Sequence, residues 1–493
     1  MDAETRANPL DSREAGAATV RGSALRTLGY GVGMVLGLVS VPFLVRQLGI
    51  AEFGYYTAVT SLVALAGGLS EAGLTAVAVR AWTTNRSEHG VVLMRDLLGL
   101  RLALTLAGVV AVVAFAALVD YPSRVVAGTA LAGAGMVVLS AQQAYTVPLQ
   151  VELRGGLLAV FDVLRQAVTT VLTLALVVAS AGLVAFLAVP IPAALATLAA
   201  TIWFVRGRYP LRPAYDRGRW RALLREALPV AAALTVHNLY LRIVIVLMSL
   251  LTVAFETGIF AASYRVTEIL FAVPFLVSQT VLPVLVHGAN TDRDRLRYAL
   301  ARLFEAGLLA GAAVVLGVIA AAPIIIDVLA GDAGDPAIGV LRIQCVVVLL
   351  VFLSTIWQGA LFALDHIPAV LVSNLIGLAA AAGVALALIP SHGAEGAAMA
   401  AVAGEVALAG SSLWLLHRHL PAIGLRAGVV VRVALAAGAG LAVLAVPGLP
   451  TLVDAVLGLL VFAAVALADG ALTPELRTAG ADVIAQRRSA PAP

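Results

Sequence analysis

Hydrophobic runs of about twenty residues follow one another along almost the whole chain, and short polar gaps separate them. About 20 apolar residues in helical form cross a bilayer once. The runs therefore predict an all-α polytopic membrane protein with about fourteen transmembrane helices. The predicted spans cover residues 23–46, 55–80, 98–119, 124–147, 156–179, 182–205, 227–251, 257–286, 302–326, 337–363, 367–389, 395–416, 428–447 and 451–468.

Arginine is concentrated in every second gap. If the N-terminus is cytoplasmic, 26 of the 32 arginines lie in inner segments, and only Arg46 and Arg124 lie at outer ends. Cytoplasmic loops are enriched in basic residues, so this alternation predicts an even number of spans with both termini in the cytoplasm. Aromatic residues near span ends are typical of interface anchors. They are Tyr55, Tyr56, Tyr145, Trp203 and Trp357.

Composition narrows the possible functions. Apolar residues make up 61% of the chain and charged residues 12%, with a mean hydropathy of +1.00. Soluble domains are about half apolar and about a quarter charged. The net charge of +4 follows from the basic loops, so we expect no nucleic-acid partner. The chain has no lysine, which excludes the phosphate loop of nucleotide-binding proteins. With one cysteine, Cys345, and no paired histidine spacing, we expect no metal and no cofactor.

The gaps also divide the chain. The longest inner gap, 207–226, is rich in arginine and proline and separates two groups of six spans. The outer gaps are short and leave no room for an extracytoplasmic catalytic domain, so we expect that the protein is not an enzyme. The predicted parts are an N-terminal tail (1–22), a first six-helix half (23–206), a linker (207–226), a second half (227–417), two further helices (418–469) and a C-terminal tail (470–493).

The two halves share a short pattern at their first outer turn. The sequence at 54–58 reads Gly-Tyr-Tyr-Thr-Ala, and the sequence at 258–262, an offset of 204, reads Gly-Ile-Phe-Ala-Ala. Six is an even number of spans, so both halves enter the membrane from the same side. This predicts parallel repeats related by a pseudo-twofold axis along the membrane normal, a transporter plan with its substrate site between the halves.

Charges inside spans are the main candidates for function. Four arginines lie inside the predicted spans, and each costs about 2.5–3.5 kcal/mol at mid-bilayer on insertion scales. They are Arg165, Arg242, Arg265 and Arg342. Arg26 and Arg46 bracket the first span. We expect Arg26, Arg46, Arg242 and Arg265 to line a cavity between the halves and to bind a phosphate or pyrophosphate through bidentate hydrogen bonds.

Local pairing is the alternative for some of these arginines. Arg265 and Glu268 are spaced i,i+3, as are Asp162 and Arg165, so each pair can meet on one helix face. For Arg165 we favour the pair. Arg342 can extend to the outer surface.

Intramembrane acids are candidates for coupling or gating. Glu71 and Glu405 lie in mid-span without an obvious helical partner, and Glu268, the i,i+3 neighbour of Arg265, is the third candidate. Such acids bind a coupling cation or proton, or serve as gate partners for arginine. Alternatively, they are neutral interior acids that are held by hydrogen bonds.

Several stretches resemble one family. Residues 46–56, Arg-Gln-Leu-Gly-Ile-Ala-Glu-Phe-Gly-Tyr-Tyr, resemble the "R-x-LG-x-x-x-FG-x-Y" turn of polysaccharide-biosynthesis flippases of the O-antigen, or Wzx, type. The resemblance extends over about residues 20–420. It includes Glu-Ala-Gly-Leu at 71–74, Glu-Ala-Leu-Pro at 226–229, the span with Ala-Ser-Tyr-Arg at 262–265, and the stretch from Ile389 to Glu405.

This resemblance implies a member of the multidrug/oligosaccharidyl-lipid/polysaccharide exporter superfamily. It further implies two six-helix halves around a cationic cavity, a location in the bacterial cytoplasmic membrane, and export of undecaprenyl-pyrophosphate-linked glycans. The expected partners are this polyprenyl-linked glycan, membrane lipid, and the glycosyltransferases and polymerase of the same pathway. One departure concerns the seventh span, where many relatives carry an acid after the arginine motif. Here Leu241-Arg242-Ile243 is followed by Val244.

Other functions remain open at this point. A lipid II flippase or a multidrug/cation antiporter would share the superfamily, although a cationic drug calls for an acidic cavity. A membrane glycosyltransferase or polymerase would need a large outer loop or an acidic catalytic pair near the outer face, and the short outer gaps argue against both.

Overall fold

The structure is a computed structural model that describes residues 13–71, 74–75, 77–79, 88–152, 154–206, 212–421, 423–445 and 450–470. Within these ranges every regular element is a helix, which confirms the predicted all-α class. The N-terminal tail lies largely outside the described residues, and so does almost all of the C-terminal tail.

Twelve helical stretches are long and apolar enough to cross a membrane among the residues described. Two long helices, α1 (Arg13–Glu71) and α14 (Ile367–His419), are each interrupted by a glycine, and both breaks fall in predicted polar gaps. Gly49 has φ +75° and Gly393 has φ +52°, a backbone region that glycine enters without steric cost. Each long helix therefore comprises two segments, which brings the total to the predicted fourteen.

Three predicted single spans consist of two helices each. They are α6 with α7 (Leu183–Ala188 and Pro190–Val205), α9 with α10 (Ala254–Leu270 and Ala272–Thr291), and α12 with α13 (Pro336–Gln344 and Val346–Ala363). Proline explains two of these breaks. Pro190 begins α7, and Pro274 has no N–H for the carbonyl of Leu270, where α9 ends.

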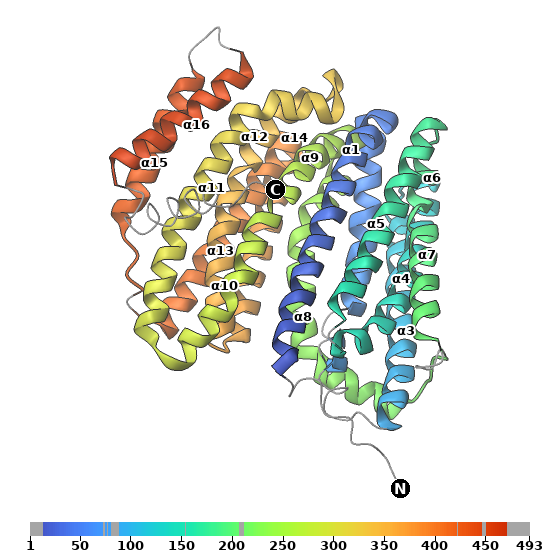
Figure 1. The fold of residues 1–493 in the computed structure, drawn as a ribbon. Helices are drawn as coiled ribbons and strands as arrows, with labels where there is room; N and C mark the ends of the chain where they lie inside the picture. The colour runs from blue at the N-terminus through green and yellow to red at the C-terminus, as the bar shows by residue number, and fades with distance from the viewer. Residues whose placement is uncertain are drawn as a thin grey trace, which may run out of the picture. The chain divides into compact units, whose positions relative to one another are not determined.

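The first compact unit covers residues 1–258. Besides α1, α6 and α7, it contains α3 (Glu88–Leu118), α4 (Ser123–Val151), α5 (Gly155–Val178) and α8 (Arg217–Leu251) (Figure 1). Helix α1 packs against α3, α4, α5 and α8, and α4 packs against α3 and α7. Within each of these helices the backbone N–H and C=O groups form hydrogen bonds with one another, as the interior of a membrane requires.

The repeated glycines of the two outer turns lie against each other in this unit. A Cβ atom built on Gly54 would lie 2.3 Å from the carbonyl oxygen of Ala254, at the start of α9. A Cβ atom on Gly258 would lie 1.9 Å from the carbonyl oxygen of Ile50, just after the Gly49 break. The first turn of α9 thus meets α1 backbone to backbone, which only glycine permits at this separation.

The second compact unit covers residues 259–493. Besides most of α9, it contains α10, α12, α13 and α14, together with α11 (Arg293–Ala330), α15 (Ala427–Leu444) and α16 (Thr451–Ala468). Helices α15 and α16 lie side by side and pack on α11 (Figure 1). The core of this unit includes the stacked rings of Phe304 and Trp357, whose centroids are 5.7 Å apart.

The aromatic residues predicted as interface anchors differ in their exposure. The side chain of Trp203 is exposed, and Tyr55 and Tyr56 are partly buried. The prediction is wrong for Trp357 and Tyr145, which are buried in the hydrophobic cores of their units. Position near a span end does not settle whether a ring points outward or toward a neighbouring helix.

Candidate functional site

Arginines of the predicted cavity occur in both units. Arg46 is exposed and lies three residues before the Gly49 break of α1, and Arg242 is half-buried in α8. Both belong to the first unit, whereas Arg265 belongs to the second. Arg26 lies in α1, but its side chain is outside the described residues. The cavity that these four arginines are predicted to line therefore stays a prediction.

Arg265 forms an ion pair on its own helix. Its Nη1 atom lies 2.7 Å from Oε2 of Glu268, as the i,i+3 spacing in α9 allows. The two side chains are 39% and 27% exposed. Both side chains are therefore partly exposed, and the guanidinium is not enclosed by its ion pair. The local pairing and a role in anion binding are thus compatible.

Glu405 is a deeply buried acid. Its side chain in α14 is 3% exposed, and Oε1 accepts a 2.5 Å hydrogen bond from Oγ of Ser354 in α13. A second buried polar contact in this unit joins Oγ of Ser263 in α9 to Oε1 of Gln344 in α12 at 2.6 Å. The hydrogen bond from Ser354 therefore joins α13 to α14 through a buried carboxyl.

Two further predictions concern acids in the first unit. Helix α1 ends at Glu71, whose side chain is outside the described residues, so its coupling role is untested. Asp162 and Arg165 lie one turn apart in α5, yet among the described side chains they form no ion pair within 4 Å. The favoured pairing of Arg165 is therefore wrong. Helical spacing makes such a contact feasible, but the rotamers chosen by neighbouring helices decide it.

The structure also places a further arginine, Arg101, inside a membrane-spanning segment. It lies in α3 with 1% exposure, and its Nη2 donates to Oγ1 of Thr75. The signal was present in the sequence, because residue 101 falls inside the predicted span 98–119. This hydrogen bond links α3 to the segment after α1.

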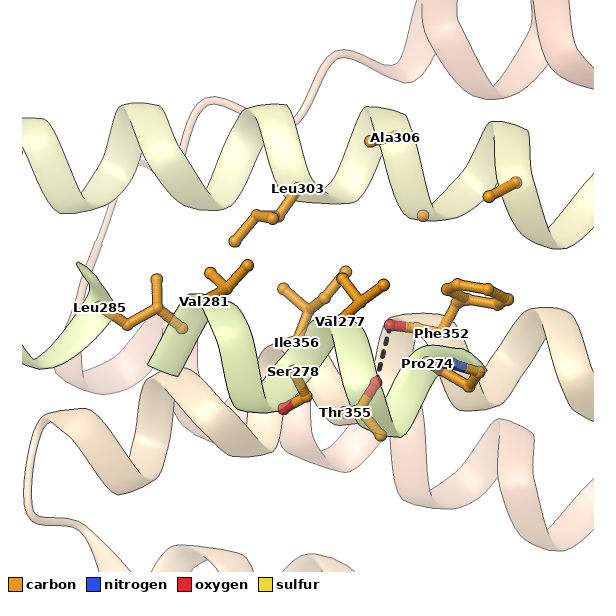
Figure 2. A pocket seen from close by; sticks show the side chains of 12 residues that line it. Pro274, Val277, Ser278, Val281, Leu285, Leu303, Ala306, Phe352, Thr355 and Ile356 are labelled. Carbon is orange, nitrogen blue, oxygen red and sulfur yellow. Dashed lines mark hydrogen bonds between the residues drawn. The ribbon is translucent and has the colours of Figure 1, made fainter. Parts of the chain in front are cut away.

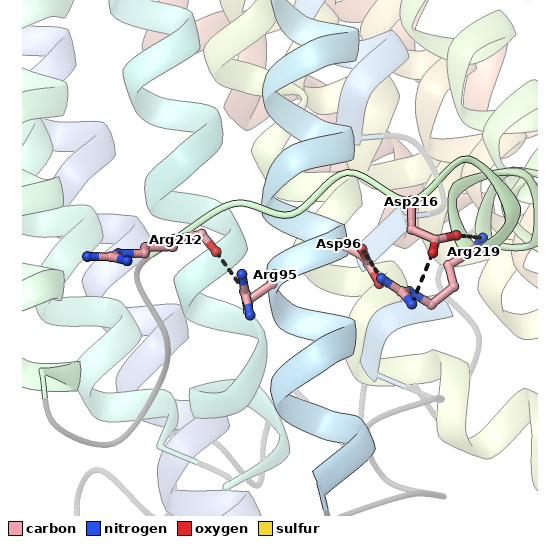
Figure 3. A network of polar contacts seen from close by, with 5 residues as sticks. All are labelled: Arg95, Asp96, Arg212, Asp216 and Arg219. Atoms are coloured by element: carbon pink, nitrogen blue, oxygen red, sulfur yellow. Dashed lines mark hydrogen bonds and ion pairs between the residues drawn. The ribbon is translucent and has the colours of Figure 1, made fainter.

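The arginine-rich linker is fastened to α3 (Figure 3). Asp216 caps α8 by accepting a 2.9 Å hydrogen bond from the backbone N–H of Arg219. The Arg219 guanidinium then pairs with Asp96 of α3, whose side chain is 1% exposed, and with Asp216 at 3.1 Å. We call residues 212–219 the linker strap. The Arg219 N–H keeps the pKa of Asp216 below its ordinary value, and the hydrogen bond to Asp96 raises the pKa of Arg219.

Backbone contacts complete this attachment. The N–H of Ala214 donates to the carbonyl of Arg95 at 2.9 Å. Figure 3 shows the second contact, in which Nε of Arg95 donates to the carbonyl of Arg212 at 3.3 Å. A Cβ atom on Gly99 would lie 2.2 Å from the carbonyl oxygen of Ala214, so glycine permits this approach. The strap therefore follows the N-terminal part of α3 closely, and Arg219 of this linker has a structural role.

Comparison with known proteins gives one family and one fold. The family model described as "Polysaccharide biosynthesis protein" matches residues 19–288, more than half of the chain. No curated protein sequence matches at a significant level.

Solved structures with a similar fold are membrane transporters. The lipid II flippase MurJ, in an inward closed conformation, shares 10% identity over 91% of this chain and 98% of its own, with a TM-score of 0.74. An inward-facing multidrug resistance MATE family transporter of the MOP superfamily shares 14% identity over 81% of this chain and 98% of its own, with a TM-score of 0.65. A MOP superfamily transporter from Pyrococcus furiosus, in which a reversed polarity of the binding pocket suggests a different function, shares 16% identity over 82% and 96%, with a TM-score of 0.57. At these identities the likeness shows the fold alone, and this fold is that of a multi-pass membrane protein.

Proposed function

Because the chain belongs to the polysaccharide biosynthesis protein family, whose fold is that of MOP-superfamily flippases and transporters, we propose that it is a flippase for lipid-linked oligosaccharide. It moves undecaprenyl-pyrophosphate-linked glycan from the inner to the outer leaflet of the bacterial cytoplasmic membrane, for surface polysaccharide biosynthesis. Both termini are cytoplasmic in this proposal, as the arginine distribution predicts. The pathway's glycosyltransferases and polymerase would supply the glycan and use it, and the chain itself would carry out no covalent chemistry.

The observation that carries this proposal is the half-exposed state of Arg265 inside a span. A guanidinium in hydrocarbon is costly, so it needs a wet or anionic environment. Arg265, Arg242, Arg46 and Arg26 would bind the pyrophosphate as bidentate donors while the polyprenyl chain remains in lipid. One half then rocks against the other, which is alternating access.

Acidic residues would set the direction of transport. The Glu268 carboxylate pairs with Arg265 when no substrate is bound, and the pyrophosphate displaces this carboxylate as it enters. Glu405, held by Ser354, takes up or releases a proton or cation between the two orientations, and Glu71 has the corresponding role in the first half. The membrane potential, worth about 2.3 kcal/mol per charge per 100 mV, supplies a driving force for such a charge movement.

A lipid II flippase is the second candidate, because the MurJ fold covers 91% of this chain. Its substrate would carry the same pyrophosphate on a polyprenyl tail, so the arginines would act alike. The family match to polysaccharide biosynthesis favours the oligosaccharide. Measuring the rate at which the same purified protein transfers each labelled lipid distinguishes these two substrates.

The test uses purified full-length protein in vesicles that contain fluorescent undecaprenyl-pyrophosphate glycan. We expect transfer between leaflets without any change in the mass of the lipid. Arg265→Ala should slow transfer at least about tenfold, since a charge-assisted hydrogen bond contributes about 1.5–3 kcal/mol. Arg221→Ala, which removes an exposed arginine of α8 at the linker, is the matched control and should transfer normally. Full transfer by folded Arg265→Ala would remove Arg265 from the mechanism, and no transfer by the wild-type protein would count against the function itself.

A further inference from the structure

An apolar cavity of about 120 Å³ lies between α10, α11 and α13 in the second unit (Figure 2). Its hydrocarbon wall runs from Leu285 and Leu303 at one end to Ala310 and Phe352 at the other. The exposed side chain of Val277 lies at its edge, so the cavity is open along α10. Apolar cavities of about 150 Å³ in proteins bind molecules as large as benzene, so this volume suits a few linked carbon atoms.

Polar groups in this cavity are few. The Thr355 hydroxyl is engaged within α13, where it donates to the carbonyls of Val351 at 2.7 Å and Phe352 at 3.1 Å (Figure 2). The other lining hydroxyl is that of Ser278. A buried water molecule typically makes about three hydrogen bonds, whereas this lining offers two hydroxyls, one of which is already engaged. The chemistry of the wall therefore selects a hydrocarbon occupant.

Basic side chains lie at the end of α11 from which the cavity begins. Arg293 and Arg295 are exposed in its first turn. The neighbouring acids are engaged, since Asp292 caps α11 and Asp294 pairs with Arg297 at 2.6 Å. The charge left at this helix end is positive and suits a phosphate group.

The spacing between charge and cavity matches a membrane lipid. At about 1.5 Å per helical residue, Leu303 lies roughly 12 Å from Arg295 along α11, and Ala310 lies roughly 22 Å from it. Half of a bilayer, including the headgroups, is about 20–22 Å thick. A phosphate on the arginines would thus place its hydrocarbon chain within the cavity.

We infer that this cavity and the arginines at the start of α11 form a binding site for an anionic phospholipid, with one acyl chain between α10, α11 and α13 and the phosphate on Arg293 and Arg295. Bulk anionic lipid outnumbers any biosynthetic intermediate in a membrane, so mass action favours an acyl chain over a polyprenyl tail. The site does not depend on the proposed transport activity.

Native mass spectrometry of the purified full-length protein tests this site. The probes are palmitoyl-oleoyl phosphatidylglycerol and phosphatidylcholine with the same chains. We expect the wild-type protein to bind phosphatidylglycerol preferentially. Ala306→Leu fills the cavity and should weaken this binding about tenfold or more, because each buried methylene is worth roughly a factor of four. Ala387→Leu adds the same side chain at an exposed position of α14 and should leave binding unchanged.

Removal of arginine charges tests whether the lipid headgroup binds at the start of α11. Arg293→Gln with Arg295→Gln should lower phosphatidylglycerol binding to the level of phosphatidylcholine. Arg221→Gln with Arg225→Gln removes two exposed charges elsewhere and should not. If Ala306→Leu unfolds, Ala310→Leu at the exposed rim of the cavity repeats the test. Unchanged binding in the cavity-filling variant, equal binding of both phospholipids by the wild type, or displacement of phosphatidylglycerol by equimolar undecaprenyl phosphate would each overturn the inference.

Discussion

Substitution of Gly258 by alanine should lower the stability of the first unit strongly. The Cβ atom of Gly258→Ala would lie 1.9 Å from the Ile50 carbonyl oxygen, whereas ordinary contacts begin at 3.4 Å. The backbone must therefore move by about 1.5 Å (3.4 minus 1.9), and Ile50 cannot turn aside because the clashing atom belongs to the main chain. Overpacking costs about 1–3 kcal/mol, and a rigid backbone contact places this change at about 3 kcal/mol.

Thermal unfolding of the purified protein, followed by circular dichroism, measures this cost. About 3 kcal/mol corresponds to a fall in Tm of roughly 6–12 °C for a unit of this size. The control is Gly383→Ala in α14, where an added Cβ atom meets nothing within 4 Å. Alanine favours a helix over glycine by about 0.5–1 kcal/mol, so the control should unfold at the same or a higher temperature. Equal Tm values for the two variants would refute the close backbone approach between α1 and α9.

Three further outcomes follow from the buried and charged side chains. Trp357→Ala should cost about 3–5 kcal/mol of unfolding free energy, whereas Trp203→Ala at an exposed ring should cost little, and similar melting temperatures would contradict this. The pKa of Asp216 is lowered by the Arg219 N–H, so the carboxylate stabilises the linker strap above the ordinary aspartate pKa near 4, and this contribution is lost as the pH falls through the lower folded pKa. Amide exchange of the strap should then accelerate in the wild type, whereas Asp216→Ala, which has no acceptor for that N–H, should exchange fast at every pH. Glu405→Gln should keep its contact with Ser354 and the fold but lose any pH dependence of transport, so an unaltered pH profile in vesicles would exclude Glu405 from coupling.

Local patterns were sufficient wherever a feature depends on neighbouring residues in the chain. The all-α class follows from apolar runs, because a membrane leaves helices as the means to satisfy the backbone. The breaks at Gly49 and Gly393 fall in gaps that the polar pattern marks. The contact between Arg265 and Glu268 follows from i,i+3 spacing, although identical spacing produces no pair between Asp162 and Arg165.

Features that depend on contacts between distant segments could not be predicted from local sequence patterns. Runs of consecutive residues carry the apolar segments, the alternation of charge and the family motifs, so these features are readable without a structure. The tertiary structure decided that Arg101 is buried, that Ser354 holds Glu405 from another helix, and that Asp96 anchors the linker strap through Arg219. Helix packing brings such partners together across tens or hundreds of positions, and the direction in which each helix turns its side chains has no counterpart in linear spacing.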